Sequence, residues 1–214
     1  MQKSPIDPSI KNLIFDLGGV ILDLSIDHTL QSFATLSGFD KKRIDQLYAT
    51  APEFLSYETG LITDDEFRAF VRKVYSITCS SDDIDITWTA MLRGLPIRKL
   101  QLLERLKEKF NVFLLSNTNS IHLKYINESL LPATVQKKLT LDNYFHRAYY
   151  SHVMKKRKPN ADIFEQVLEE NGLKPEETLF LDDNHDNIEG AKKLGIRTAL
   201  VNTPDFMLDY FHEY

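Results

Sequence analysis

The sequence predicts an α/β protein with a doubly wound parallel sheet, a Rossmann-like core into which a small helical cap domain is inserted. Short apolar runs that stop at polar residues alternate with segments of helical period, which is typical of parallel strands joined by helices. One long stretch has helical periods without such runs, and it predicts the insertion. With 214 residues, the chain is long enough for both parts.

Four apolar runs are predicted to form strands that are buried on both faces of the sheet. They cover residues 13–15, 112–115, 178–181 and 197–201, and each is followed by a polar residue. Since ligands of open α/β sheets bind beyond the carboxyl ends of the strands, we expect the functional residues at these ends.

Helices are predicted between these runs, because apolar residues recur there at helical spacing. Gly172 and Gly195 follow the second and third stripes and are predicted to end those helices. The three stripes consist of Leu100, Leu102, Leu103 and Leu106; Ile163, Phe164, Val167 and Leu168; and Ile188, Ala191 and Leu194.

The region 25–93 is predicted to be the helical cap, and residues 1–24 and 94–214 the α/β catalytic core. Its last predicted helix runs from Ile84 to Leu92, and Thr63 with Glu66 resembles a capping box at the start of another. The alternative is a set of extra helices packed flat on the sheet, which the sequence leaves open.

Composition narrows the classes of partner. Lys and Arg number 26 and Asp and Glu 31, a formal charge of −5, so no basic surface for nucleic acid is expected. Cys79 is the only cysteine, which favours a reducing compartment, the cytoplasm by default. No membrane anchor is expected, because Asp16 and Asp23 interrupt the apolar stretch 13–24. Monomer and homodimer both stay open.

Carboxylates at two strand ends are candidate ligands of Mg²⁺. Asp16 follows the first run, and Asp182 with Asp183 follows the third. Adjacent carboxylates repel each other unless a cation or protons neutralise them, and oxygen-only ligands suit Mg²⁺. Alone, Asp16 could be a turn former and Asp182 a helix N-cap, so Asp183 is the preferred ligand.

Cationic and polar groups that could bind a phosphate accompany these carboxylates. Lys158 precedes Pro159, which restricts its backbone to extended conformations. Ser116 and Asn117 follow the second run, where hydroxyl and amide groups at a strand-to-helix turn bind phosphate oxygens well. Their alternative role is helix capping.

Four ordered stretches resemble the motifs of the haloacid dehalogenase-like hydrolase superfamily. They are FDLGGV at 15–20, LLSN at 114–117, RKP at 157–159 and FLDDNHDN at 180–187. The last stretch is most similar to the subgroup of bacterial sugar-1-phosphate (glucose-1-phosphate) phosphatases, which carry a helical cap.

The resemblance implies a Mg²⁺-dependent phosphatase with an aspartyl-phosphate intermediate. Asp16 would be the nucleophile and a metal ligand, with Asp183 as another ligand. Lys158 would offset charge on Asp16 and on the phosphoryl group. The roles implied for the other motif residues are the Gly18 carbonyl as metal ligand, Ser116 as a phosphate-binding group, Asp182 as a direct or water-mediated metal contact, and Asn187 as support for the metal loop.

Gly18 departs from the pattern of most phosphatases of this superfamily, which have a second aspartate there as proton donor. Leaving groups that depart easily, such as those of sugar 1-phosphates or acyl phosphates, are therefore favoured. His28 and Asp23 are candidate proton donors only because they lie near Gly18 in the sequence. An ordinary surface role is preferred for each. Leu24, Tyr57 and Trp88 are candidates for contact with the substrate, whereas most aromatic residues of the cap are expected to lie in its core.

The main hypothesis is hydrolysis of a small phosphorylated metabolite that resembles a sugar phosphate. A dehalogenase, which needs no metal, and a binding protein that has lost catalysis are the alternatives.

Overall fold

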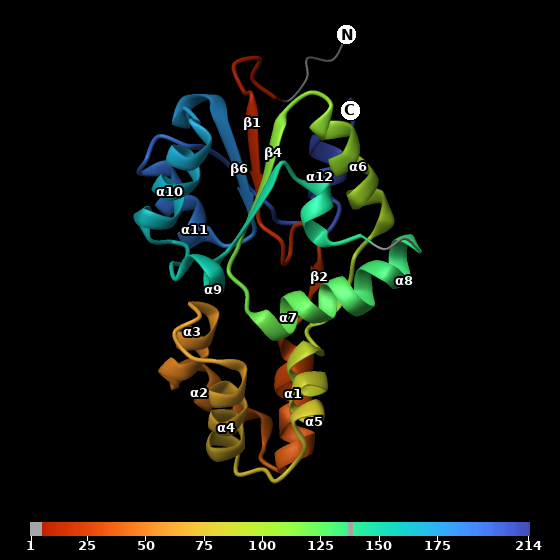
Figure 1. Cartoon of the computed structure of the whole chain (residues 1–214), viewed down its shortest axis with the longest axis vertical. Coiled ribbons are helices and arrows are strands. Elements are labelled where there is room, and N and C mark those ends of the chain that lie inside the picture. The colour runs from red at the N-terminus through yellow and green to blue at the C-terminus, as the bar shows by residue number, and fades with distance from the viewer. Residues whose placement is uncertain (1–5, 137–138) are drawn as a thin grey trace.

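The computed structural model describes residues 6–136 and 139–214 (Figure 1). Residues 1–5 and 137–138, which belong to the expected core, lie outside the described part.

Five parallel strands form the central sheet, in the order β5-β4-β1-β6-β7. Phe15 at the end of β1 pairs with Leu114 of β4 on one side and with Leu181 of β6 on the other. The residues that follow these strands therefore meet at one edge, at the point where the strand order reverses. The strands are β1 Asn12–Phe15, β4 Asn111–Ser116, β5 Arg147–Tyr150, β6 Thr178–Asp182 and β7 Arg197–Leu200.

The strand β5 was not expected from the sequence. It begins with the exposed Arg147 and lies at the edge of the sheet, where it pairs only with β4. The sequence of β5, Arg-Ala-Tyr-Tyr, lacks the continuous apolar run from which the other strands were predicted. The other edge strand, β7, was predicted from such a run, but its residues are exposed or half-buried and not buried on both faces as expected.

Helices cover both faces of the sheet (Figure 1), which confirms the doubly wound core. Ile14 packs into one buried cluster with residues of α10 and α11, whereas Leu13 and Phe15 pack into another with residues of α6. Successive side chains of β1 thus face opposite layers. The helices are α6 Ile97–Lys107, α10 Ala161–Asn171, α11 His185–Lys192 and α12 Phe206–Tyr210.

Five helices between β1 and α6 gather beyond the carboxyl ends of the strands (Figure 1). The expected capping box of Thr63 and Glu66 is present at the start of α4. The aromatic rings of Phe54, Phe67 and Trp88 pack together inside this group. The helices are α1 Ile26–Ser37, α2 Lys41–Thr50, α3 Pro52–Glu58, α4 Asp64–Tyr75 and α5 Ser81–Thr89.

Two expectations for this group need correction. The last helix ends at Thr89, not Leu92, because Leu92 begins a short strand, β3 Leu92–Gly94. This strand pairs antiparallel with β2 Asp23–Leu24, so the chain leaves and re-enters the core side by side. The additional helix α3 was not expected.

Shorter elements complete the described chain. They are α7 Ser120–Tyr125, the π-helix Ile126–Leu130, α8 Leu131–Val135, α9 Ser151–Met154, and the 3₁₀ turns Leu141–Tyr144 and Pro175–Glu177. Within residues 6–136 and 139–214, no helix combines the length and apolarity that crossing a membrane requires.

Candidate active site

Asp16 lies directly after β1 and is 9% exposed. Its Oδ1 atom accepts a hydrogen bond of 2.7 Å from Lys158 Nζ. Burial raises the pKa of Asp16 to about 7; the positive charge of Lys158 opposes this rise, and the carboxylate of Asp182 adds to it. A cation close to Asp16 would therefore stabilise its ionised form.

Lys158 is the cation that links two of the predicted carboxylates. Its Nζ atom lies 2.7 Å from Asp16 Oδ1 and 2.6 Å from Asp182 Oδ2, and the residue is 1% exposed. Burial by itself would lower the pKa of Lys158, but the two carboxylates raise it. The ammonium group is thus held in its charged form.

Asn117 positions the backbone of Lys158. Asn117 Nδ2 donates to the Lys158 carbonyl and Asn117 Oδ1 accepts from the Lys158 amide, both at 3.0 Å. The Asn117 side chain was expected to bind substrate, but in the structure it braces the lysine. Contact of Asn117 with a phosphate stays a prediction.

Asp182 is fully buried and its carboxylate is surrounded by protein donors. Oδ1 accepts from the Asn184 amide at 2.8 Å, and Asn187 Nδ2 lies 3.1 Å from both oxygens. The alternative reading of Asp182 as the N-cap is wrong, because Asn184 caps α11. Asn187 is placed to orient Asp182.

Asp183 is exposed and faces the turn after β1. A Cβ atom added to Gly19 would overlap the Asp183 carboxylate, and the φ of Gly19 is +73°. Both the close contact and the backbone conformation therefore require glycine at this position. Although the residue as a whole is exposed, its carboxyl group is partly desolvated, and this desolvation, followed by the charge of Asp182, raises the pKa of Asp183.

The three carboxylates fit a hard divalent cation. Asp16, Asp182 and Asp183 each offer an oxygen atom, and these atoms lie within 4.8 Å of one another. Three carboxylates with one nearby lysine leave an excess of negative charge at the site. Carboxylate oxygen atoms are the ligands that Mg²⁺ prefers.

A cavity of about 110 Å³ opens next to this cluster. Gly18 and the buried Ser116, at the end of β4, line it from the sheet side, and Leu24 and Trp88 line it from the side of helices α1–α5. Asn117 also lines the cavity, so five of the lining residues were predicted from the sequence.

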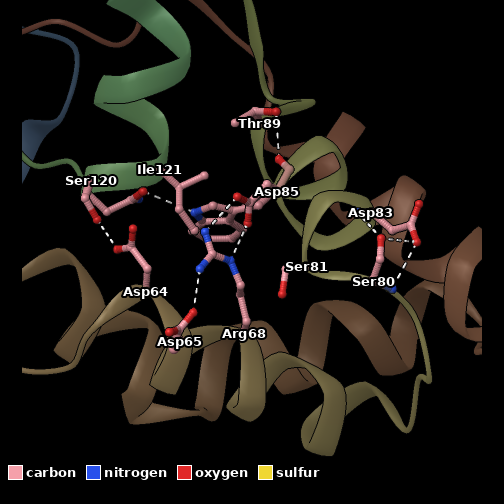
Figure 2. Close-up of polar contacts among 12 residues, drawn as sticks. Asp64, Asp65, Arg68, Ser80, Ser81, Asp83, Asp85, Thr89, Ser120 and Ile121 are labelled. Atoms are coloured by element: carbon pink, nitrogen blue, oxygen red, sulfur yellow. Dashed lines mark hydrogen bonds and ion pairs between the residues drawn. The ribbon is translucent and has the colours of Figure 1, made fainter.

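Tyr57 does not line that cavity, contrary to expectation. Its hydroxyl donates to Asp64 Oδ1 at 2.9 Å and lies 3.1 Å from Ser120 Oγ. Ser120 on α7 also bonds to Asp64 at the start of α4, as Figure 2 shows. Tyr57 therefore joins the helical group to the core.

The two acid candidates have other partners. His28 is exposed and bonds to Ser25 at 2.8 Å, in line with a surface role. Asp23 pairs with the buried Lys99 at 3.5 Å and lines a second cavity of about 450 Å³ together with Asp183.

His122 lines the 110 Å³ cavity from α7 but was not among the residues predicted from the sequence. Burial lowers the pKa of His122 to about 4, so its ring is neutral near pH 7. The bonding pattern fits a ring that donates from Nε2 to the Trp88 carbonyl at 3.1 Å and accepts at Nδ1 from Asn119 Nδ2 at 3.2 Å. The one signal in the sequence is Asn119, the N-cap of α7, three residues before His122.

A parallel sheet with carboxylates and a lysine clustered at the carboxyl ends of its strands is typical of one class of hydrolases. The chain belongs to the haloacid dehalogenase-like hydrolases, because the model of that family matches residues 10–195.

Relatives with similar sequence cover nearly the whole chain. A D-ribitol-5-phosphate phosphatase from Bacteroides thetaiotaomicron is 31% identical over 190 residues, which are 88% of this chain and 90% of the relative. A HAD family enzyme from the same organism, crystallised with magnesium and inorganic phosphate, is 38% identical with a TM-score of 0.81, covering 89% of this chain and 93% of its own.

A more distant structure shares the fold alone. The L-2-haloacid dehalogenase of Xanthobacter autotrophicus is 20% identical with a TM-score of 0.58, and the match covers 89% of this chain and 77% of that one.

Proposed function

We propose that this chain is a Mg²⁺-dependent phosphatase that hydrolyses a small sugar-like phosphate through an aspartyl-phosphate on Asp16. The observation that carries the proposal is the cluster around Lys158, which lies 2.7 Å from Asp16 and 2.6 Å from Asp182. A carboxylate that attacks a phosphate dianion faces like-charge repulsion, and a fixed ammonium group reduces it.

The metal would be held by Asp16, Asp183 and the carbonyl of Gly18. Bound Mg²⁺ would supply charge neutralisation for the phosphoryl oxygens. Asp182 suits an indirect role, because its oxygens already accept hydrogen bonds from Lys158 and Asn187.

The phosphoryl group would lie between Asp16, Ser116 and Lys158. Ser116 offers a hydroxyl at the end of β4, and Lys158 offers its ammonium group. Asp16 attacks phosphorus, the alcohol leaves, and water then cleaves the aspartyl-phosphate.

Residues 25–93 form the proposed cap, and residues 1–24 with 94–214 the catalytic core. The pairing of β2 with β3 at the boundary and the cavity between Ser116 and Trp88 support this division. A cap over the site would exclude water and select the substrate.

The name of the 31% identical relative makes D-ribitol 5-phosphate the first polyol phosphate to test. Its leaving group is a primary alcohol, which needs a proton more than the anomeric oxygen of a sugar 1-phosphate does. We further propose a cytoplasmic protein without nucleic-acid partners, on the grounds of its charge of −5 and its single cysteine.

The test is phosphate release from a panel of D-ribitol 5-phosphate, sugar phosphates, an acyl phosphate and 4-nitrophenyl phosphate, with Mg²⁺ and with chelator. Release that requires Mg²⁺ is the expected result. Folded protein that binds Mg²⁺ and releases no phosphate from any compound would point to a non-catalytic binding protein, and metal-independent release of halide from 2-haloacids to a dehalogenase.

A further inference from the structure

Position 18, where a proton donor is expected, holds a glycine, which has no proton to give. A Cβ atom on Gly18 would lie 3.0 Å from Leu24 Cδ2, so the Leu24 side chain packs directly against this position. An apolar side chain is thus the nearest neighbour of the place where a carboxyl group would begin. If the proposed phosphatase acts on alcohol leaving groups, the proton must come from elsewhere.

Three titratable side chains line the 110 Å³ cavity beside Gly18, namely Tyr48, Glu58 and His122. Both nitrogen atoms of His122 are occupied by Asn119 and Trp88, so it has no proton to give. Burial raises the pKa of Tyr48 to about 12, which makes its phenolate too costly as a base in the second step. Glu58 remains.

Glu58 is fixed relative to the catalytic lysine. Arg157 Nη2 lies 3.3 Å from Glu58 Oε2, and the hydroxyl of Ser151 lies 2.6 Å from the Glu58 carbonyl. Lys155 Nζ donates to the carbonyl of Gly60, two residues on. The end of α3 therefore packs against residues 151–158, the segment that ends at Lys158.

Gly60 makes this close packing possible. A side chain there would overlap the carbonyl of His152, so only glycine allows the close approach. Glu58 and Gly60 together form a docking element of the proposed cap, which brings a carboxyl group from the cap into the cavity of the core.

We propose that Glu58 is the general acid and base of this phosphatase, in place of the aspartate that Gly18 replaces. The inference rests on the proposed function. Glu58 has the surroundings of such a group: its side chain is 29% exposed, and burial raises its pKa while the positive charges of Arg157 and Lys158 oppose the rise. The phenol of Tyr48 on α2 also faces it, with its proton retained.

The proposed reaction has two steps. A carboxylate oxygen of Asp16 bonds to phosphorus, the bond from phosphorus to the leaving oxygen breaks, and the carboxylic acid of Glu58 gives its proton to that oxygen. Water then attacks phosphorus, the bond from phosphorus to Asp16 breaks, and the Glu58 carboxylate accepts a proton from the water. Phosphate and alcohol are released and both side chains return to their starting states.

The test compares Glu58→Gln with wild type on two kinds of substrate from the panel. Alkyl phosphates need a protonated leaving group, whereas 4-nitrophenolate leaves without a proton. We expect kcat on alkyl phosphates to fall on the order of 100-fold or more, and formation of the phosphoenzyme from 4-nitrophenyl phosphate, measured as the nitrophenolate burst, to change little. Glu53→Gln on the same helix is the matched control and should leave both rates unchanged.

Glu58→Asp covers the case in which the glutamine variant does not fold, because it keeps a carboxyl group at a shorter reach; it should lose activity on alkyl phosphates selectively. A loss of the nitrophenolate burst as large as the loss of kcat on alkyl phosphates, or no loss of kcat on alkyl phosphates in Glu58→Gln, would overturn the assignment. Wild-type release from 4-nitrophenyl phosphate alone would also overturn it, while leaving the phosphatase intact. No release by the wild type from any compound would instead mean that the proposed function itself fails.

Discussion

The side-chain amide of Asn117 makes two hydrogen bonds to the backbone of Lys158, one to its carbonyl and one from its amide, each 3.0 Å long. The residue after β4 thereby fixes a lysine 41 positions later in the chain. Because Lys158 Nζ in turn bonds to Asp16 and Asp182, the position of the ammonium group depends on this pair.

Asn117→Ala tests that dependence. Without the two hydrogen bonds, the backbone of Lys158 can shift, and a displacement of about 1 Å lowers turnover by roughly 100-fold. We expect kcat to fall by that order with Mg²⁺ affinity unchanged. Asn127→Ala, which removes a backbone contact outside the site, should keep wild-type kcat. Equal kcat in both variants would contradict the bracing role.

Asp182→Asn should destabilise the fold. The variant leaves the buried Lys158 with one carboxylate fewer, and breaking a buried pair typically costs about 3–5 kcal/mol. Urea denaturation measures the loss in free energy of unfolding. Glu189→Gln, which breaks the exposed pair with Lys192, is the control and should change nothing measurable. An unchanged midpoint for Asp182→Asn would show that the buried pair contributes little.

Gly19→Ala should weaken Mg²⁺ binding, because the added Cβ atom displaces the Asp183 carboxylate. Gly38→Ala is a matched control, since Gly38 has a φ of +72° against +73° at Gly19, yet has no neighbour near its Cβ position. Both should lose about 1–2 kcal/mol of stability from backbone strain. Only the first should weaken Mg²⁺ binding by calorimetry, about 10- to 100-fold. The same affinity in both variants would remove Asp183 from the metal site.

Because His122 is buried in its neutral form, the free energy of unfolding should decrease as the pH is lowered. Its pKa is lowered from 6.5 to about 4 in the folded chain, so between these values the unfolded state binds more protons than the folded one. Stability is therefore full above pH 6.5 and declines until about pH 4, by roughly 3 kcal/mol at most. The difference between wild type and His122→Asn in urea denaturation from pH 7 to 4 isolates this contribution. Parallel curves would mean that His122 titrates normally.

The sequence was sufficient to predict the carboxylates and polar groups at strand ends. Asp16 follows β1, and Ser116 and Asp182 end the adjacent parallel strands β4 and β6, so the register of the sheet brings them together without further information. The run of Leu13, Ile14 and Phe15 is fully buried, as its composition predicts. The edge strand β5 escaped prediction because it has no such run.

Residues that meet between the proposed cap and the core could not be predicted in the same way. Glu58 and Arg157 are 99 positions apart, and neither follows a strand. Their contact depends on how α3 docks on the core, which the close approach of Gly60 to His152 determines. For the same reason Tyr57, an aromatic residue of α3, was placed in the cavity although its hydroxyl bonds to Ser120 instead.

Phosphate release from 4-nitrophenyl phosphate by wild type and Asp16→Asn at saturating Mg²⁺ shows whether Asp16 attacks phosphorus. We expect the variant, folded by circular dichroism, to release phosphate at the rate of the blank, because an amide cannot form the phosphoenzyme. A folded Asp16→Asn variant with wild-type turnover would mean that another group attacks phosphorus.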